Sequence, residues 1–186
     1  MDATVRARAE LALDNLRRHG DRGYIGEPVS QLEHALQCAA LARKAGAGPQ
    51  EILAALFHDV GHLVAPSGAP EMDGLGIVDH ENIGARWLAG LGVDTRVCGL
   101  VASHVQAKRY LALRKPGYHD ALSEASRGTL RFQGGPMSED EARRFEADPL
   151  FAAKLRLRVW DEGAKDPQLQ AAGLDTYLDM LADHME

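Results

Sequence analysis

Apolar residues recur every three or four positions along most of the chain, which is the spacing of amphipathic helices. Over residues 3–18 this pattern brings Val5, Ala9 and Leu16 to one side of a predicted helix. Ser30 and Glu33 have the spacing of a capping box and predict a helix that begins at residue 30 and runs to about residue 44. The same reasoning predicts helices over residues 49–57, 80–88, 95–114, 119–131, 138–147, 149–162 and 175–184.

Glycine and proline mark the connections between these helices. Residues 20–28 form a glycine-rich loop, and residues 66–79 form a longer loop rich in both residue types. No alternating apolar pattern flanks a two-residue turn, so the chain lacks the signal for a β-hairpin. We therefore expect an all-α fold, a helical bundle of roughly eight helices, in which residues 1–186 form a single domain.

Composition and charge narrow the class of protein. The chain has 186 residues and a formal net charge of −6, which disfavours a nucleic-acid or membrane-surface partner because both need a basic surface. It contains no apolar run long enough for a transmembrane helix, and its N-terminus has no signal-peptide pattern. Its two cysteines fit no disulfide framework. We expect a cytoplasmic protein.

Four histidines are spaced at regular intervals along the chain. His34, His58, His80 and His104 are separated by 24, 22 and 24 residues, and Asp59 directly follows His58. Each interval is about the length of one helix and one loop, so each histidine can return to the same level of a bundle. Imidazole suits first-row transition metals, and a carboxylate can bridge two ions. The pattern therefore predicts a metal site.

These residues resemble a known family. The order His34, His58-Asp59 and Asp161 is similar to the signature of HD-domain metalloproteins, and His80 and His104 match the additional histidines of the dinuclear members. The resemblance implies two ions in one site. The first would be held by His34, His58, Asp59 and Asp161, and the second by His80 and His104, with Asp59 as the bridge.

Longer segments resemble one branch of this family, the HD-domain mixed-valent di-iron oxygenases similar to 2-amino-1-hydroxyethylphosphonate dioxygenase. The similar segments are residues 24–27, 31–34, 53–62, 99–111, 133–137 and 158–162. The resemblance implies cleavage of the C–P bond of (R)-2-amino-1-hydroxyethylphosphonate, an organophosphonate, with O2 to give glycine and phosphate. It also implies two Fe ions as a mixed-valent Fe(II)/Fe(III) pair, O2 as co-substrate, and a separate upstream hydroxylase that supplies the substrate.

A phosphonate dianion needs cations and directional donors when it leaves water. Lys108 follows His104 by one helical turn, and Arg158 precedes Asp161 by three residues, so each cation shares a helix face with a predicted metal ligand. The resemblance implies a substrate-binding clamp of His62, Lys108, Ser126, Gln133 and Arg158.

The glycine-rich loop carries two further candidates. The resemblance implies that Tyr24 and Glu27 approach the open metal ion and the amine of the substrate. Glu27 could accept a hydrogen bond from a primary ammonium, and Tyr24 could fill a coordination position until substrate arrives. Together with His62, these two residues form the predicted catalytic set.

Three other functions compete with this one. A metal-dependent phosphohydrolase would need an apolar or aromatic slot for a nucleotide base, and aromatic residues make up only 5% of the chain. A metal-sensing or scaffold module would not need the clamp. A related oxygenase acting on the N-trimethylated substrate would yield glycine betaine, but a quaternary ammonium favours an aromatic cage, whereas Glu27 suits a primary amine.

Overall fold

The computed structural model describes residues 2–24 and 26–186 and confirms the all-α fold class. Within these ranges the chain forms helices and three isolated β-bridges but no strand. None of the described helices has the length and apolar character needed to cross a membrane. The helices are α1 (Ala3–His19), α2 (Gln31–Lys44), α3 (Pro49–Phe57), α4 (Gly61–Val64), α5 (His80–Gly90), α6 (Thr95–Val101), α7 (His104–Arg114), α8 (Tyr118–Ala121), α9 (Glu124–Phe132), α10 (Glu139–Glu146), α11 (Phe151–Gly163), the 3₁₀ helix η1 (Leu174–Tyr177) and α12 (Leu178–Ala182).

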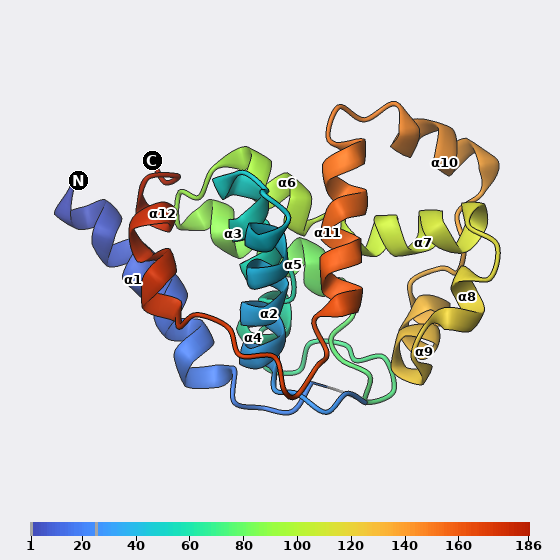
Figure 1. Cartoon of the computed structure of the whole chain (residues 1–186), viewed down its shortest axis with the longest axis horizontal. Helices are drawn as coiled ribbons and strands as arrows, with labels where there is room; N and C mark the ends of the chain where they lie inside the picture. Colours follow the sequence, from blue (N-terminus) through green and yellow to red (C-terminus); the bar gives the residue numbers. More distant parts are fainter. Residues whose placement is uncertain (1, 25) are drawn as a thin grey trace.

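The main core lies in the middle of the molecule. Helices α2 and α3 pack against each other, α11 packs against both, and α6 packs between α3 and α5 (Figure 1). The apolar α3 has buried side chains on all sides, among them Leu53 and Phe57, which have no exposed surface. This core fixes the position of α2, which carries His34, and of α3, which directly precedes the His58-Asp59 pair. The candidate site is therefore supported by packed helices.

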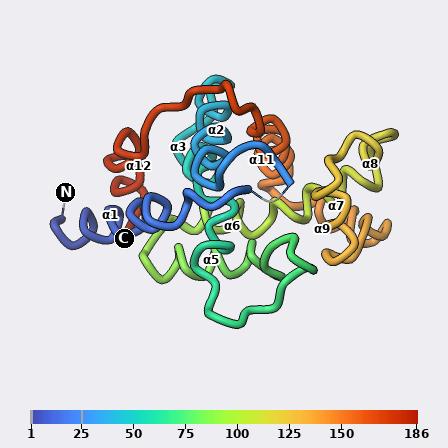
Figure 2. Tube along the Cα trace, turned by 90° about the horizontal axis from the view of Figure 1, so that it is seen from below, coloured from blue at the N-terminus to red at the C-terminus, as the bar shows by residue number. Residues whose placement is uncertain are grey.

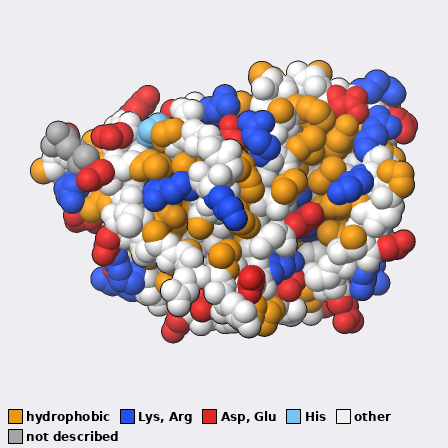
Figure 3. Space-filling model, viewed as in Figure 1, with side chains coloured by type: hydrophobic (Ala, Val, Ile, Leu, Met, Phe, Trp, Pro, Cys, Tyr) orange, Lys and Arg blue, Asp and Glu red, His pale blue; other side chains and the backbone are white. Residues whose placement is uncertain are grey.

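The two ends of the molecule differ. Helices α1 and α12 lie together at one end, where both chain termini are found, and α7 to α10 form the other end (Figures 1 and 2). Two smaller apolar clusters support that second end, one around Phe145 and one around Tyr118. On the face drawn in Figure 3, acidic and basic side chains are interspersed over the surface.

The prediction of one continuous helix over residues 95–114 is wrong. The chain forms two helices there, α6 and α7, with a break at residues 102 and 103. At this break the hydroxyl of Ser103 donates to the carbonyl of Gly99, and Nδ1 of His104 donates to the carbonyl of Val101 at 2.9 Å. Side chains that take up backbone carbonyls in this way compete with the helical ladder. The break allows α7 to start at His104.

Two other predicted helices also divide. The helix expected over residues 119–131 is two helices, α8 and α9, because Ser123 caps α9 by accepting a hydrogen bond from the backbone N–H of Ser126 at 3.2 Å. The helix expected over residues 175–184 begins as the 3₁₀ helix η1 and ends earlier, as α12. The additional helix α4 follows the turn at residues 58–60. The molecule thus has more, shorter helices than periodicity predicted.

Helices α4 and α5 touch at a glycine beside the candidate site. A Cβ atom added at Gly61 would lie 1.8 Å from the carbonyl oxygen of His80, so no side chain fits there. We expect Gly61→Ala to lower the free energy of unfolding by about 1–3 kcal/mol, since one of the two helices must shift. Denaturant titration measures this change. Gly90→Ala, at a helical position with no atom within 4 Å of the added Cβ, is the control and should not destabilise the protein; equal stability of both variants would contradict the prediction.

Candidate metal centre

Four buried histidines converge from four different elements. They come from α2, from the turn after α3, and from the first residues of α5 and α7. Nδ1 of each ring lies 2.8–3.1 Å from a backbone carbonyl oxygen. Because a carbonyl only accepts, Nδ1 carries a proton and donates, which leaves Nε2 as the ring atom available to a metal ion. The pairs are His34 with Ala164, His58 with Ala55, His80 with Ile77 and His104 with Val101.

The Nε2 atoms face each other in two pairs. Nε2 of His34 lies 3.1 Å from Nε2 of His58, and Nε2 of His80 lies 3.0 Å from Nε2 of His104. Two nitrogens that both lack a proton repel each other at this separation unless a cation lies beside them. Nitrogen ligands about 2.1 Å from one ion are about 3 Å apart when they meet it near a right angle. The donor set therefore fits two metal ions.

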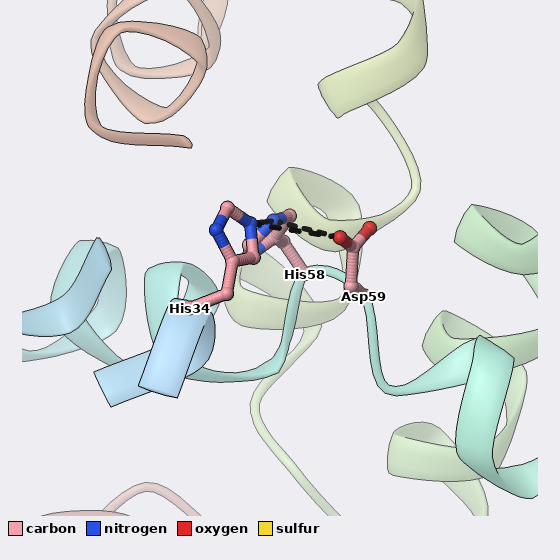
Figure 4. Close-up of side chains that lie close together, drawn as sticks. All are labelled: His34, His58 and Asp59. Carbon is pink, nitrogen blue, oxygen red and sulfur yellow. Dashed lines mark hydrogen bonds and ion pairs between the residues drawn. The ribbon is translucent and has the colours of Figure 1, made fainter. Parts of the chain in front are cut away.

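The carboxylate of Asp59 lies between the two pairs. Its Oδ2 is 3.3 Å from Nε2 of His58, and its Oδ1 is 3.3 Å from Nε2 of both His80 and His104. Figure 4 shows Asp59 turned toward His34 and His58. Asp161 lies beside the first pair, with Oδ1 3.4 Å from Nε2 of His34. One carboxylate oxygen of Asp59 therefore serves each pair, which is the arrangement of a bridging ligand.

Both carboxylates remain ionised in the buried site. Burial raises the pKa of Asp59, but the positive charge that His58 carries in the metal-free centre, where Asp59 raises the pKa of this imidazole well above its ordinary value, outweighs burial and holds the pKa of Asp59 well below its usual range. Burial acts in the same sense on Asp161, and the guanidinium of Arg158 does most to bring its pKa well below the usual range. Nη1 of Arg158 donates directly to Oδ2 of Asp161. The centre is therefore preorganised to receive positive charge.

His62 differs from the four histidines in its hydrogen bonding. The backbone N–H of Ile77 donates to its Nδ1 at 3.1 Å, so the proton of the neutral ring is on Nε2. The ring stacks on His80 with 3.9 Å between centroids, and burial lowers the pKa of His62 to about 3. Although it lies within ligand range of Asp59 and His80, His62 presents an N–H donor, as a substrate-binding residue would.

A small pocket of about 60 Å³ opens onto the two carboxylates. Of the predicted clamp, His62, Ser126 and Arg158 line it. Lys108 is buried beside it, and its Nζ donates at 2.8 Å to the hydroxyl of Thr129, which also lines the pocket. The structure does not bring Gln133 into this lining. Its side chain lines a neighbouring pocket instead, and its Oε1 is buried without a partner among the described residues.

Of the two candidates from the glycine-rich loop, the structure brings Tyr24 to the centre, whereas Glu27 is outside the described pocket lining. The ring of Tyr24 lines the pocket and stacks on His34, with 4.0 Å between centroids and 14° between planes. Burial, followed by the charges of Asp59 and Asp161, raises the pKa of Tyr24 well above its ordinary value, so the phenol is neutral. The carboxylate of Glu27 is engaged in an ion pair with Lys165, whose Nζ lies 2.6 Å from Oε1.

Sequence reasoning missed three residues here. Thr129 follows Ser126 by three positions, Gln31 precedes His34 by three, and Lys165 follows Asp161 by four. Gln31 and Thr129 line the pocket, and Lys165 holds Glu27. The spacing of three or four residues that indicated Lys108 and Arg158 would have indicated Gln31 and Thr129 as well, whereas Lys165 lies beyond the end of α11 and is not indicated by it.

Residues 32–148 match the family model described as HD domain. The chain belongs to the HD-domain family. The HD-domain match ends before α11, yet α11, which carries Asp161, packs against α2, α3 and α7. That residues 1–186 form one domain stays a prediction.

Three relatives cover most of this HD-domain chain. It is 39% identical over 153 residues to [1-hydroxy-2-(trimethylamino)ethyl]phosphonate dioxygenase (glycine-betaine-forming) of Leisingera caerulea. This match covers 82% of this chain and 78% of the relative. It is 36% identical over 178 residues to hydroxymethylphosphonate dioxygenase of Gimesia maris, or 95% and 88% of the two chains. It is 40% identical over 167 residues to the uncharacterized protein L432 of Acanthamoeba polyphaga mimivirus, or 89% and 76%. The predicted resemblance to HD-type phosphonate oxygenases is confirmed.

Proposed function

We propose that this protein is a metal-dependent oxygenase that cleaves the C–P bond of a small 1-hydroxyphosphonate with O2. The observation that carries the proposal is the pair of facing Nε2 atoms on each side of Asp59, directly beside the buried cations Lys108 and Arg158. The names of two relatives support both the reaction class and the substrate class.

The first ion would be held by one histidine pair with both carboxylates, and the second by the other pair with Asp59. When bound, a mixed-valent Fe(II)/Fe(III) pair would supply the one-electron chemistry that O2 requires, and its open positions would accept the substrate oxygens. Histidine and carboxylate donors without a cysteine suit iron in both oxidation states. The proposed ligands are His34, His58, Asp59 and Asp161 for one ion and His80, His104 and Asp59 for the other.

The side chains around the pocket bind and orient the phosphonate. Nη2 of Arg158 is buried and has no hydrogen-bond partner among the described residues, so it is a donor that a phosphonate oxygen can satisfy. Nε2–H of His62 and the hydroxyl of Ser126 supply neutral donors, and Lys108 supplies a second cation. The ring of Tyr24, stacked on His34, limits access of water to the centre. In this proposal Gln133 acts from the neighbouring pocket.

Within this class we propose (R)-2-amino-1-hydroxyethylphosphonate as the substrate, which with one O2 gives glycine and phosphate. Glu27 follows Gly26, which packs against Ala125 of the pocket lining, and because its Oε1 pairs with Lys165, its Oε2 would accept from a primary ammonium. The N-trimethylated analogue would need an aromatic cage of several rings. Among the described residues that line the metal pocket, Tyr24 is the single aromatic residue other than histidine, which is too few for such a cage.

In the test, the iron-loaded protein is incubated with and without O2 with each of three substrates. They are 2-amino-1-hydroxyethylphosphonate, its N-trimethylated analogue and hydroxymethylphosphonate. We expect phosphate release and O2 uptake in equal amounts with at least one substrate, and glycine from the amino compound. Phosphate release at full rate without O2 would instead identify a phosphohydrolase. Failure of all three substrates in air would overturn the proposed function.

Lys108 predicts a pH dependence of substrate capture. Burial, followed by the charge of Arg158, lowers the pKa of Lys108 to about 7, so its cationic form is lost as the pH rises through that value. We expect kcat/KM to fall above this pH by roughly tenfold per unit, because the neutral amine no longer pairs with the phosphonate.

The control is Lys108→Ala, measured over the same pH range with metal content determined in parallel. This variant should bind metal normally, show a raised KM, and lose that alkaline limb of the profile. A limb that persists unchanged in Lys108→Ala would assign the titration to another group, such as the phosphonate itself.

A further inference from the structure

A turn from the glycine-rich loop rests directly on the pocket wall. The backbone N–H of Glu27 donates to the carbonyl of Tyr24 at 3.0 Å. Gly26 has a φ of +75°, and a Cβ atom added to it would lie 2.9 Å from Cβ of Ala125, which lines the metal pocket. The turn therefore places Gly26, which directly precedes Glu27, against α9 at the pocket wall.

Lys165 approaches this turn from the other side. Its Nζ lies 2.6 Å from Oε1 of Glu27 and 3.5 Å from the hydroxyl of Ser123, and it is 5.9 Å from the ring centroid of Tyr24. The two charged side chains are largely buried, with 18% of Lys165 and 10% of Glu27 exposed. Lys165 directly follows Ala164, whose carbonyl accepts from His34, so its position is tied to the metal centre.

Lys165 lines a cavity that adjoins the metal pocket. A cleft of about 390 Å³ is lined by Lys165, Ser123 and Glu162, and it shares Ser126 and Arg158 with the metal pocket. A phosphonate group held by Arg158 and Ser126 would therefore direct the remainder of a substrate toward Lys165 and Glu27. The metal pocket of about 60 Å³ is too small to hold much more than the phosphonate head.

We propose that Lys165 is a specificity-determining residue, which neutralises Glu27 and thereby sets how strongly the site prefers a substrate with a cationic tail. This inference rests on the proposed function. A partly buried carboxylate without a partner favours an ammonium and disfavours a tail that leaves the charge unpaired. With Lys165 in place the pair has no net charge, so the site also accepts a hydroxyphosphonate with an uncharged tail.

A series of variants varies the local charge in unit steps. Lys165→Met leaves Glu27 alone with a charge of −1, and Glu27→Gln leaves Lys165 alone with a charge of +1. The wild type and the double variant both have a net charge of zero. The readout is the ratio of kcat/KM for 2-amino-1-hydroxyethylphosphonate to kcat/KM for hydroxymethylphosphonate, which differ in the ammonium tail.

We expect the ratio to rise by roughly tenfold in Lys165→Met, to fall by a similar factor in Glu27→Gln, and to return toward the wild-type value in the double variant. Lys165→Arg keeps the charge and should keep the ratio, which separates charge from packing. Lys44→Met, at the exposed end of α2, is the matched control and should change neither rate constant.

The outcomes distinguish this inference from the function on which it rests. A wild type that oxidises neither phosphonate overturns the proposed function. A wild type that oxidises either one, together with a ratio that does not move in Lys165→Met or that moves in the opposite direction, overturns only the role of Lys165. A kcat/KM ratio that rises and falls with the charge of the variants supports the proposed role of Lys165. The same role is supported if 2-amino-1-hydroxyethylphosphonate is turned over only by Lys165→Met and not by the wild type.

Discussion

His80→Ala is expected to leave one metal ion bound per chain and to abolish O2 consumption. Nε2 of His80 lies 3.0 Å from Nε2 of His104 and 3.3 Å from Oδ1 of Asp59. Its removal takes one of the two nitrogen ligands from the second proposed ion. The pair around His34 and His58 keeps all of its donors, so the first ion should stay. We expect the rate to fall by on the order of a thousandfold or more, because a catalytic ion stabilises a transition state by several kcal/mol.

Metal content per chain and O2 uptake with a hydroxyphosphonate measure these two effects. His119→Ala is the matched control, because this histidine is exposed and lies on α8, away from the centre. That variant should bind two ions and retain full activity. Two ions and normal turnover in His80→Ala would show that Asp59 does not bridge a pair in the way we propose.

Arg158→Met is expected to cost both stability and substrate binding. Nε of Arg158 donates to the hydroxyl of Tyr118 at 3.0 Å and to Oε1 of Glu162 at 2.9 Å, and Nη1 donates to Asp161. The substitution leaves buried negative charge without its partner, which typically lowers the free energy of unfolding by about 3–5 kcal/mol. It also removes the Nη2 donor from the pocket. We expect kcat/KM to fall by roughly a hundredfold or more.

Chemical denaturation of the metal-free protein isolates the effect on stability, and kcat/KM of the iron-loaded protein gives the effect on catalysis. Arg156→Met breaks an ion pair with Glu51 in which the arginine is half exposed, and it should change stability by no more than about 1 kcal/mol. Arg158→Lys restores a charge without the planar fork and should recover only part of each loss. If Arg158→Met keeps the wild-type kcat/KM, Arg158 does not bind the phosphonate.

The all-α fold and the convergence of four histidines around Asp59 could be predicted from the sequence. Helical periodicity is a local property, so the pattern of Leu53, Leu56 and Phe57 predicts a buried α3 without any knowledge of its neighbours. The intervals between the four histidines equal a helix and a loop, and this spacing predicted their convergence. The family signature added Asp161 and the pairing of the two ions, and the longer similar segments, among them residues 99–111 and 133–137, added the proposed reaction because such runs are far more specific than the His-Asp pair.

Tertiary structure decided where helices break and which side chains meet. Periodicity runs unbroken through Ser103, but its hydroxyl takes a backbone carbonyl and the helix ends. Gln133 lies close in sequence to Thr129, yet it faces a different pocket because the chain turns after α9. The protonation of Nδ1 in the four histidines depends on carbonyls as distant as that of Ala164, 130 residues from His34.

The sequence by itself predicted the fold class from helical periodicity, the four histidines from intervals of one helix and one loop, and Lys108 and Arg158 from spacing within one helical turn, while the family resemblance added Asp161. The pairing of Glu27 with Lys165, 138 residues apart, was decided only by the tertiary structure. No local pattern encodes such a contact. It forms only when the glycine-rich loop and the segment that follows α11 are packed on the same core. The charge that a substrate tail meets is therefore a property of the folded molecule.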